Sequence, residues 1–112
     1  TIVKDLHELF VASLQREAKD RIDDLENLLD HGEYDRAYLC DEYEVEMRNR
    51  QRLEEVVKAL GIKLDVVLAE RLAQADARLR AMCRPGPFIW SDELEHVYPA
   101  NPYWYLHLQP IH

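Results

Sequence analysis

Apolar residues recur every three or four positions through the first quarter of the chain, and this spacing constrains the fold more than any other feature. In an α-helix residues so spaced share one face, whereas a strand would distribute them over both faces. We therefore expect a helix over residues 3–29 whose apolar stripe packs against other elements. Gly32 is expected to end it, because glycine readily adopts the left-handed conformation found just past many helices. The stripe consists of Val3, Leu6, Phe10, Leu14, Ala18, Ile22, Leu25 and Leu29.

Two further helical segments are expected before residue 85. One begins at about Glu33, whose charge suits the positive end of a helix dipole, and ends before Gly61. Its apolar spacing is less regular, and residues 48–52 contain no core candidate, so residues 33–60 form either one helix or two. A third helix is expected over residues 64–82, where leucine, valine and alanine recur with helical period.

The composition changes at Arg84-Pro85-Gly86-Pro87, beyond which lie both tryptophans and many tyrosines. Proline cannot continue a helix, so we expect a turn here, a short helix over residues 91–97, and an extended segment from residue 98 onward. The predicted fold class is all-α, a three- or four-helix bundle over residues 1–84. Residues 85–112 form a Pro- and aromatic-rich C-terminal extension packing on that bundle, within one domain. Whether its aromatic residues are core or interface stays open.

Negative charge is concentrated in one part of the chain. The net charge is −8, yet residues 23–46 alone carry ten acidic residues against one basic residue, Arg36. Such an excess repels nucleic acid and anionic membranes and attracts a basic protein. We expect these acids to form a partner-binding surface, with two tyrosines as anchors; the alternative is ordinary solvated surface. The expected contact residues are Asp23, Asp24, Glu26, Asp30, Glu33, Tyr34, Asp35, Tyr38, Asp41, Glu42, Glu44 and Glu46.

Three arginines follow this segment at alternate positions, Arg48, Arg50 and Arg52. Their side chains point to different sides of a helix, and the preceding negative charge opposes a phosphate backbone. We therefore interpret them as intramolecular partners of those acids, or as contacts at an interface of mixed charge.

The sequence offers little for catalysis, and we predict no enzyme, no cofactor, no metal site and no catalytic residue. Glu93 and His96 form a single Glu-x-x-His unit, whereas carboxylate-bridged di-iron bundles need two such units and further glutamates. With three glycines in all, a phosphate-binding loop is not expected. Cys40 and Cys83 are isolated, which favours a reducing cytoplasm, although a disulfide between them stays possible. No membrane-spanning run or signal peptide is recognisable.

One stretch resembles a known family. The helical hairpin of small bacterial immunity proteins, including the Maf-type proteins of polymorphic and contact-dependent toxin systems, is similar to Leu25-Glu26-Asn27-Leu28-Leu29-Asp30-His31-Gly32-Glu33-Tyr34-Asp35-Arg36-Ala37. The resemblance covers about residues 20–80. It implies a cytoplasmic protein that binds and neutralises a cognate toxin with a basic surface, often a nuclease. Two alternatives stay open: a self-associating structural or regulatory subunit without catalytic activity, and a metal-dependent enzyme using Glu93 and His96.

Overall fold

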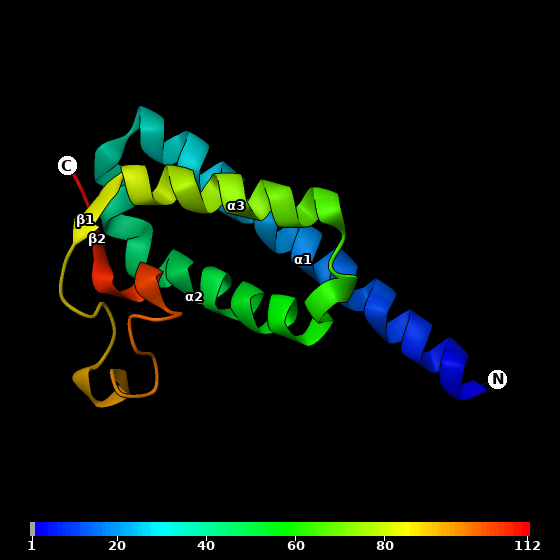
Figure 1. The fold of residues 1–112 in the computed structure, drawn as a ribbon. Helices are drawn as coiled ribbons and strands as arrows, with labels where there is room; N and C mark the ends of the chain where they lie inside the picture. Colours follow the sequence, from blue (N-terminus) through cyan, green and yellow to red (C-terminus); the bar gives the residue numbers. More distant parts are fainter. Residues whose placement is uncertain (1) are drawn as a thin grey trace.

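Three α-helices form the body of the protein in the computed structural model, which describes residues 2–112. α1 lies along both α2 and α3 (Figure 1), and these contacts build the core. The predicted all-α bundle is confirmed, with three α-helices among the residues described. In chain order the elements are α1 (Ile2–Tyr34), α2 (Arg36–Leu60), the 3₁₀ helix η1 (Gly61–Lys63), α3 (Val66–Ala81), β1 (Cys83–Pro85), the 3₁₀ helices η2 (Asp92–Leu94) and η3 (Trp104–His107), and β2 (Leu108–Pro110).

A single residue, Asp35, separates α1 from α2, so the chain reverses abruptly (Figure 1). Asp35 is the N-cap of α2: its backbone is extended, and its Oδ1 accepts a hydrogen bond from the backbone N–H of Tyr38 at 3.2 Å. This bond satisfies one of the N–H groups left free at a helix start. The expectations that Gly32 ends the first helix and that Glu33 begins the second are therefore wrong, because both residues lie inside α1.

Gly32 allows α1 and α2 to approach closely and does not adopt a left-handed conformation. A Cβ atom at this position would lie 3.1 Å from the Cβ of Leu39, closer than ordinary van der Waals contact. Both residues are buried. The absence of a side chain thus allows α1 and α2 to pack closely where they meet.

α2 is one uninterrupted helix, so the choice between one helix and two over residues 33–60 is resolved in favour of one. The expectation that residues 48–52 contribute nothing to the interior is wrong, because the Arg50 side chain is only 4% exposed. Its guanidinium forms ion pairs with Asp76 and Glu54, which allow an arginine to be buried. Apolarity alone does not reveal a charged residue that is paired in the fold.

The C-terminal segment is less extended than expected and contains a small sheet. β1 and β2 pair antiparallel, with Cys83 opposite Pro110. From residue 98 onward, where an extended segment was expected, only β2 is a strand, because residues 104–107 form the 3₁₀ helix η3. The short helix expected over residues 91–97 is reduced to the single 3₁₀ turn η2. Three residues of this segment, Phe88, Tyr105 and Leu106, are buried in the same core as the helices.

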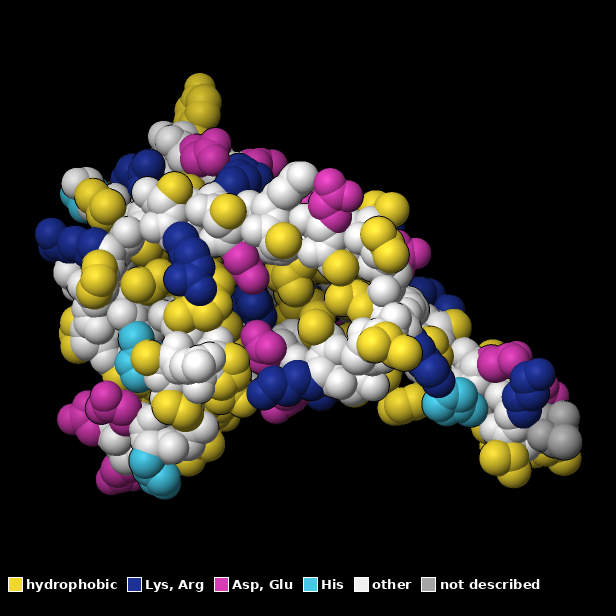
Figure 2. Space-filling model, viewed as in Figure 1, with side chains coloured by type: hydrophobic (Ala, Val, Ile, Leu, Met, Phe, Trp, Pro, Cys, Tyr) yellow, Lys and Arg dark blue, Asp and Glu magenta, His cyan; other side chains and the backbone are white. Residues whose placement is uncertain are grey.

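The first turns of α1 extend beyond the bundle (Figures 1 and 2). The expected apolar stripe over residues 3–29 is buried only from Leu14 onward, whereas Val3, Leu6 and Phe10 are exposed. The inclusion of these three in the core was therefore wrong. The physical reason is length: α1 has 33 residues, α2 has 25 and α3 has 16, so the longest helix outruns its partners.

Candidate functional site

The expected acidic surface is divided in the structure between two sides of α1. Four of its acids face α3, where they meet arginines. Three others lie between α1 and α2, and the rest belong to neither group. The α3-facing acids are Asp23, Glu26, Asp30 and Glu33. The acids between α1 and α2 are Asp24, Glu42 and Glu46.

Two arginines of α3 neutralise the α3-facing acids. The ion pairs are Arg71 with Asp23 at 2.6 Å and with Glu26, and Arg78 with Asp30 at 2.7 Å and with Glu33 at 3.0 Å. The hydrogen bond from Arg71, followed by that from Lys19, holds the pKa of Asp23 below its usual range. These carboxylates mainly link α1 to α3 through ion pairs, because their charge is already compensated within the chain.

The three acids between α1 and α2 have no such compensation. None of Asp24, Glu42 and Glu46 lies within ion-pairing distance of a basic side chain among residues 2–112. Glu42 and Glu46 are one turn apart on α2, and Asp24 approaches from α1. Partial burial, followed by repulsion from Glu42 and then Asp24, raises the pKa of Glu46. This cluster is therefore an unpaired concentration of negative charge.

Two of these acids, Asp24 and Glu46, line a hollow of about 310 Å³ between the two helices. We call it the α1–α2 groove, and define it by Asp24, Asn27, Leu28, His31, Tyr38 and Glu46, with Glu42 as a neighbour. The rings of His31 and Tyr38 stack at one part of it, with centroids 3.8 Å apart and planes 8° from parallel. Carboxylates beside an aromatic ring form a suitable site for a cationic side chain. The carboxylates attract its positive charge, and the face of the ring contacts its weakly hydrated surface.

The remaining expected contact residues lie elsewhere. Asp35 caps α2, as described above, and Tyr34 is 97% exposed at the end of α1. Asp41 and Glu44 are exposed on α2 outside the α1–α2 groove. Of the twelve residues expected to form the contact surface, the groove thus unites Asp24, Tyr38 and Glu46, with Glu42 beside them. Sequence reasoning missed its other members, since Asn27 and His31 carry no distinguishing pattern.

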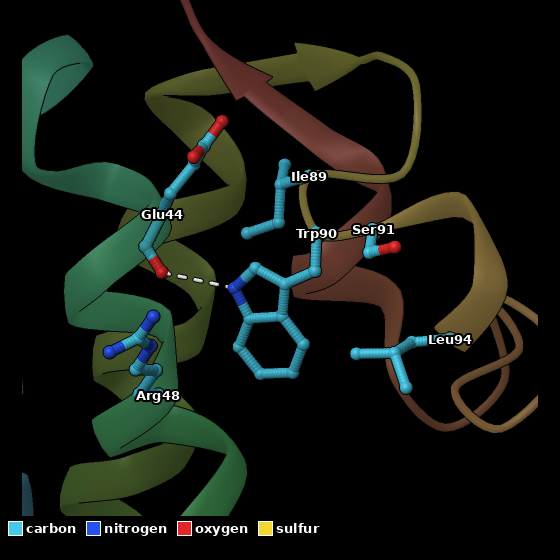
Figure 3. A pocket seen from close by; sticks show the side chains of 6 residues that line it. All are labelled: Glu44, Arg48, Ile89, Trp90, Ser91 and Leu94. Carbon is cyan, nitrogen blue, oxygen red and sulfur yellow. Dashed lines mark hydrogen bonds between the residues drawn. The ribbon is translucent and has the colours of Figure 1, made fainter.

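A second hollow, of about 630 Å³, lies between α2 and the C-terminal segment (Figure 3). Trp90 directs its indole N–H toward α2 and donates a hydrogen bond to the backbone oxygen of Glu44 at 3.1 Å. Arg48, on the neighbouring turn of α2, is exposed and has no ion pair within the described chain. Only the fold brings these residues together, so no sequence pattern marks this hollow. Its lining is Glu44, Arg48, Ile89, Trp90, Ser91 and Leu94.

The other two arginines of this stretch bind acids from outside residues 23–46. Arg50 pairs with Asp76 and Glu54, as described above, whereas Arg52 pairs with Glu17 and Glu55. Arg50 and Arg52 are therefore intramolecular ion-pair partners, but the interpretation that they pair with the acids of residues 23–46 is wrong. Arg50 instead lies close to Asp76 of α3, Arg52 lies close to Glu17 of α1, and both also reach acids on the following turn of α2.

Groups with catalytic potential are few in the described chain. No cluster of three or more metal-ligating side chains occurs among residues 2–112. Glu93 and His96 are exposed in the turns around η2. Cys40 and Cys83 are free thiols, and burial raises the pKa of Cys83 to about 11, which disfavours its thiolate.

Comparisons with known protein families, with curated proteins and with solved structures find no match to this chain. Among residues 2–112, no helix is both long and apolar enough to cross a membrane.

Proposed function

We propose that this protein is a non-catalytic binding protein whose α1–α2 groove receives basic side chains from a protein partner. One observation carries the proposal: Asp24, Glu42 and Glu46 gather without a counter-ion beside the stacked rings of His31 and Tyr38. Partial burial is the main cause of the raised pKa of Glu46, and the second is repulsion from Glu42 and Asp24, since like charges brought together in a folded protein repel one another. An arginine or lysine placed among them would remove that repulsion.

The proposed binding surface is smaller than the whole acidic segment of residues 23–46. Asp23, Glu26, Asp30 and Glu33 are already engaged by Arg71 and Arg78, so they offer less attraction to a second cation. The unpaired acids Asp24, Glu42 and Glu46 still attract cations, because no basic side chain compensates their charge. Complementary charge accelerates association, to roughly 10⁸ M⁻¹s⁻¹ or more at low salt, and makes binding sensitive to ionic strength.

The proposed partner is a bacterial toxin with a basic surface, and the proposed role is that of an immunity protein. This part rests on the resemblance of residues 25–37 to the hairpin of small helical immunity proteins. A nuclease fits best within that class, because a cleft that binds phosphates is lined by cations and would accept an acidic helical hairpin. The free thiols Cys40 and Cys83 suit the reducing cytoplasm in which such a protein would act.

The test uses the product of the adjacent gene as the candidate partner, co-expressed with the full chain. Binding is then measured by titration calorimetry at low and at high salt. The variant Asp24→Asn/Glu42→Gln/Glu46→Gln should bind at least about tenfold more weakly at low salt, equivalent to about 1.4 kcal/mol. The difference from wild type should shrink as salt rises.

A matched control removes the same amount of charge elsewhere. Glu70, Glu93 and Glu95 are exposed and have no ion pair within residues 2–112. Their simultaneous replacement by glutamine should weaken binding by less than about threefold, because only the long-range field changes. Equal losses in the two triple variants would remove the groove from the interface, and the absence of any complex would contradict the immunity role.

A further inference from the structure

The two cysteines are distant in the sequence, but the fold brings both to the place where α2 meets the small sheet. Cys40 lies on α2, and β1 and β2 lie beside the first turns of that helix (Figure 1). The Sγ of Cys40 approaches the backbone oxygen of Pro110 in β2 at 3.9 Å. Pro110 in turn lies directly opposite Cys83 in the ladder of β1 and β2. Pro110 is therefore a neighbour of both cysteines.

Side chains on either side of Cys40 along α2 reach the residues around Cys83. Arg36, one turn before Cys40, donates a hydrogen bond to the backbone oxygen of Met82 at 3.4 Å. Tyr43, one turn after Cys40, lies within hydrogen-bonding reach of the Cys83 thiol. Residues three and four apart share one face of a helix. Cys40 therefore lies between these two contacts along the face of α2 that meets Cys83.

The ladder of β1 and β2 fixes the direction of Cys83. The N–H of Ile111 donates a hydrogen bond to the backbone oxygen of Met82 at 2.9 Å, so Cys83 and Pro110 are a non-hydrogen-bonded pair. The Cα atoms of such a pair are about 4.5 Å apart, and the two side chains lie on the same face of the sheet. Cys83 is buried in the core, so this face is turned toward the helices. Cys40 and Cys83 thus approach the same contact from opposite sides.

We propose that Cys40 and Cys83 are a redox-sensitive pair that forms a disulfide between α2 and β1 on oxidation and is reopened by thiols. Both thiols are free in the structure. Cys40 is half-buried and lines an open hollow of about 200 Å³ between α2 and the C-terminal segment. Cys83 is buried, and burial raises its pKa to about 11. An oxidant therefore reacts first at Cys40, and Cys83 resolves the product.

The reaction balances with a low-molecular-weight disulfide, such as oxidised glutathione, as the oxidant. The Cys40 thiolate attacks one sulfur of this disulfide, forms a mixed disulfide and releases one glutathione thiolate. The Cys83 thiolate then attacks Sγ of Cys40, which breaks the mixed disulfide and releases the second glutathione. The protein loses two electrons and two protons, and the glutathione disulfide gains them. The second step is slow at neutral pH and accelerates as the pH rises, because little of Cys83 is then a thiolate.

The disulfide would join the C-terminal segment covalently to the bundle. The closed loop spans residues 40–83 and includes all of η1 and α3. Closing a long loop stabilises a fold chiefly by lowering the conformational entropy of the unfolded chain. The inference is independent of the proposed function, because neither cysteine lines the α1–α2 groove.

The first test follows the chemistry. The full chain is reduced, freed of reductant and incubated with oxidised glutathione at about pH 8.5, where thiolates form. The wild-type monomer should lose both reactive thiols, and its intact mass should fall by two hydrogen atoms. Cys83→Ser should stop at the mixed disulfide, with one glutathione on Cys40. Cys40→Ser should react about tenfold more slowly than Cys83→Ser, because its remaining thiol is buried. A disulfide-linked dimer, a stable glutathione adduct on wild type, or no reaction would overturn the proposal.

A second measurement tests whether the native fold holds the two thiols in bonding geometry. Oxidised wild type should unfold at a midpoint about 5–10 °C above that of the reduced protein, and dithiothreitol should reverse the shift. The variant Cys40→Ser/Cys83→Ser should show no shift after the same treatment. A disulfide that forms without raising the midpoint would mean that the fold has to distort to make it, which contradicts a pair positioned for bonding.

Discussion

Arg50 and Asp76 form a two-point ion pair between α2 and α3, with Nε–Oδ1 and Nη2–Oδ2 distances of 3.0 and 2.9 Å. The guanidinium also donates to Glu54 and lies over the ring of Tyr105, 4.6 Å from its centroid. Burial alone would lower the pKa of Arg50, but hydrogen bonds from its guanidinium to Asp76 outweigh burial and the pKa is raised. One buried cation thus joins two helices and the C-terminal segment.

Removal of the Asp76 carboxylate should destabilise the protein strongly. Asp76→Ala leaves Arg50 buried with only Glu54 as a counter-ion, and the expected loss of unfolding free energy is about 3 kcal/mol. Urea unfolding followed by circular dichroism measures it. As a control, Glu55→Ala removes an exposed partner of Arg52 and should cost less than about 1 kcal/mol. Similar losses in both variants would mean that burial adds nothing to the Arg50–Asp76 pair.

Two buried tyrosines should respond oppositely to loss of the hydroxyl. Tyr43 donates a hydrogen bond to the backbone oxygen of Tyr105 at 2.6 Å, so Tyr43→Phe should lower the unfolding free energy by about 1–2 kcal/mol. The hydroxyl of Tyr105 is buried without a partner in the described structure, so Tyr105→Phe should be neutral or stabilising by up to about 1 kcal/mol. Thermal and urea unfolding of both variants compares them. A larger loss for Tyr105→Phe would contradict this assignment.

Gly32 should be intolerant of a side chain although it lies within a helix. Helix propensity favours Gly→Ala by about 1 kcal/mol, but the new Cβ would meet the Cβ of buried Leu39 at 3.1 Å. We expect the clash to prevail, with a net loss of about 1 kcal/mol in unfolding free energy. An exposed helical position offers no such conflict. A Gly32→Ala variant more stable than wild type would show that α1 and α2 can separate at little cost.

Glu17 and Glu46 should give opposite pH dependences. Hydrogen bonds from Arg52 and then Arg21 lower the pKa of Glu17 to about 2. Its contribution is present above the unfolded pKa of 4.5 and is lost as pH falls toward 2. Glu17→Gln should therefore be less stable than wild type at pH 7, by about 1 kcal/mol after solvent screening, and match it near pH 2.

The raised pKa of Glu46 reverses the sign. The folded state favours the protonated form, so wild-type stability falls as pH rises through the unfolded pKa of 4.5 and beyond. Glu46→Gln should equal wild type near pH 3 and exceed it at pH 7 by about 0.5 kcal/mol or less, since the groove is open to solvent. Urea midpoints across this range measure both variants. A Glu46→Gln variant less stable than wild type at pH 7 would mean that its carboxylate is compensated.

Local patterns in the sequence were enough to predict the all-α fold and the approximate course of α1 and α3, because helix formation depends on residues three and four apart, but they did not place the junction of α1 and α2. The stripe from Leu14 to Leu29 and the break after residue 82 are visible without any knowledge of contacts. The excess of negative charge in residues 23–46 is equally local. These features follow from side-chain chemistry and from the 3.6-residue period of the helix.

The tertiary structure alone decided which of those charges remain unpaired. Asp23 and Asp24 are neighbours in sequence, yet the first meets Arg71 and the second enters the α1–α2 groove, because adjacent positions on a helix point about 100° apart. Leu6 and Leu14 belong to the same apolar stripe, but only Leu14 has helices beside it. Burial and charge compensation depend on residues distant in the sequence, such as Arg71, which is 48 positions from Asp23, and packing of the three helices determines which of these residues meet.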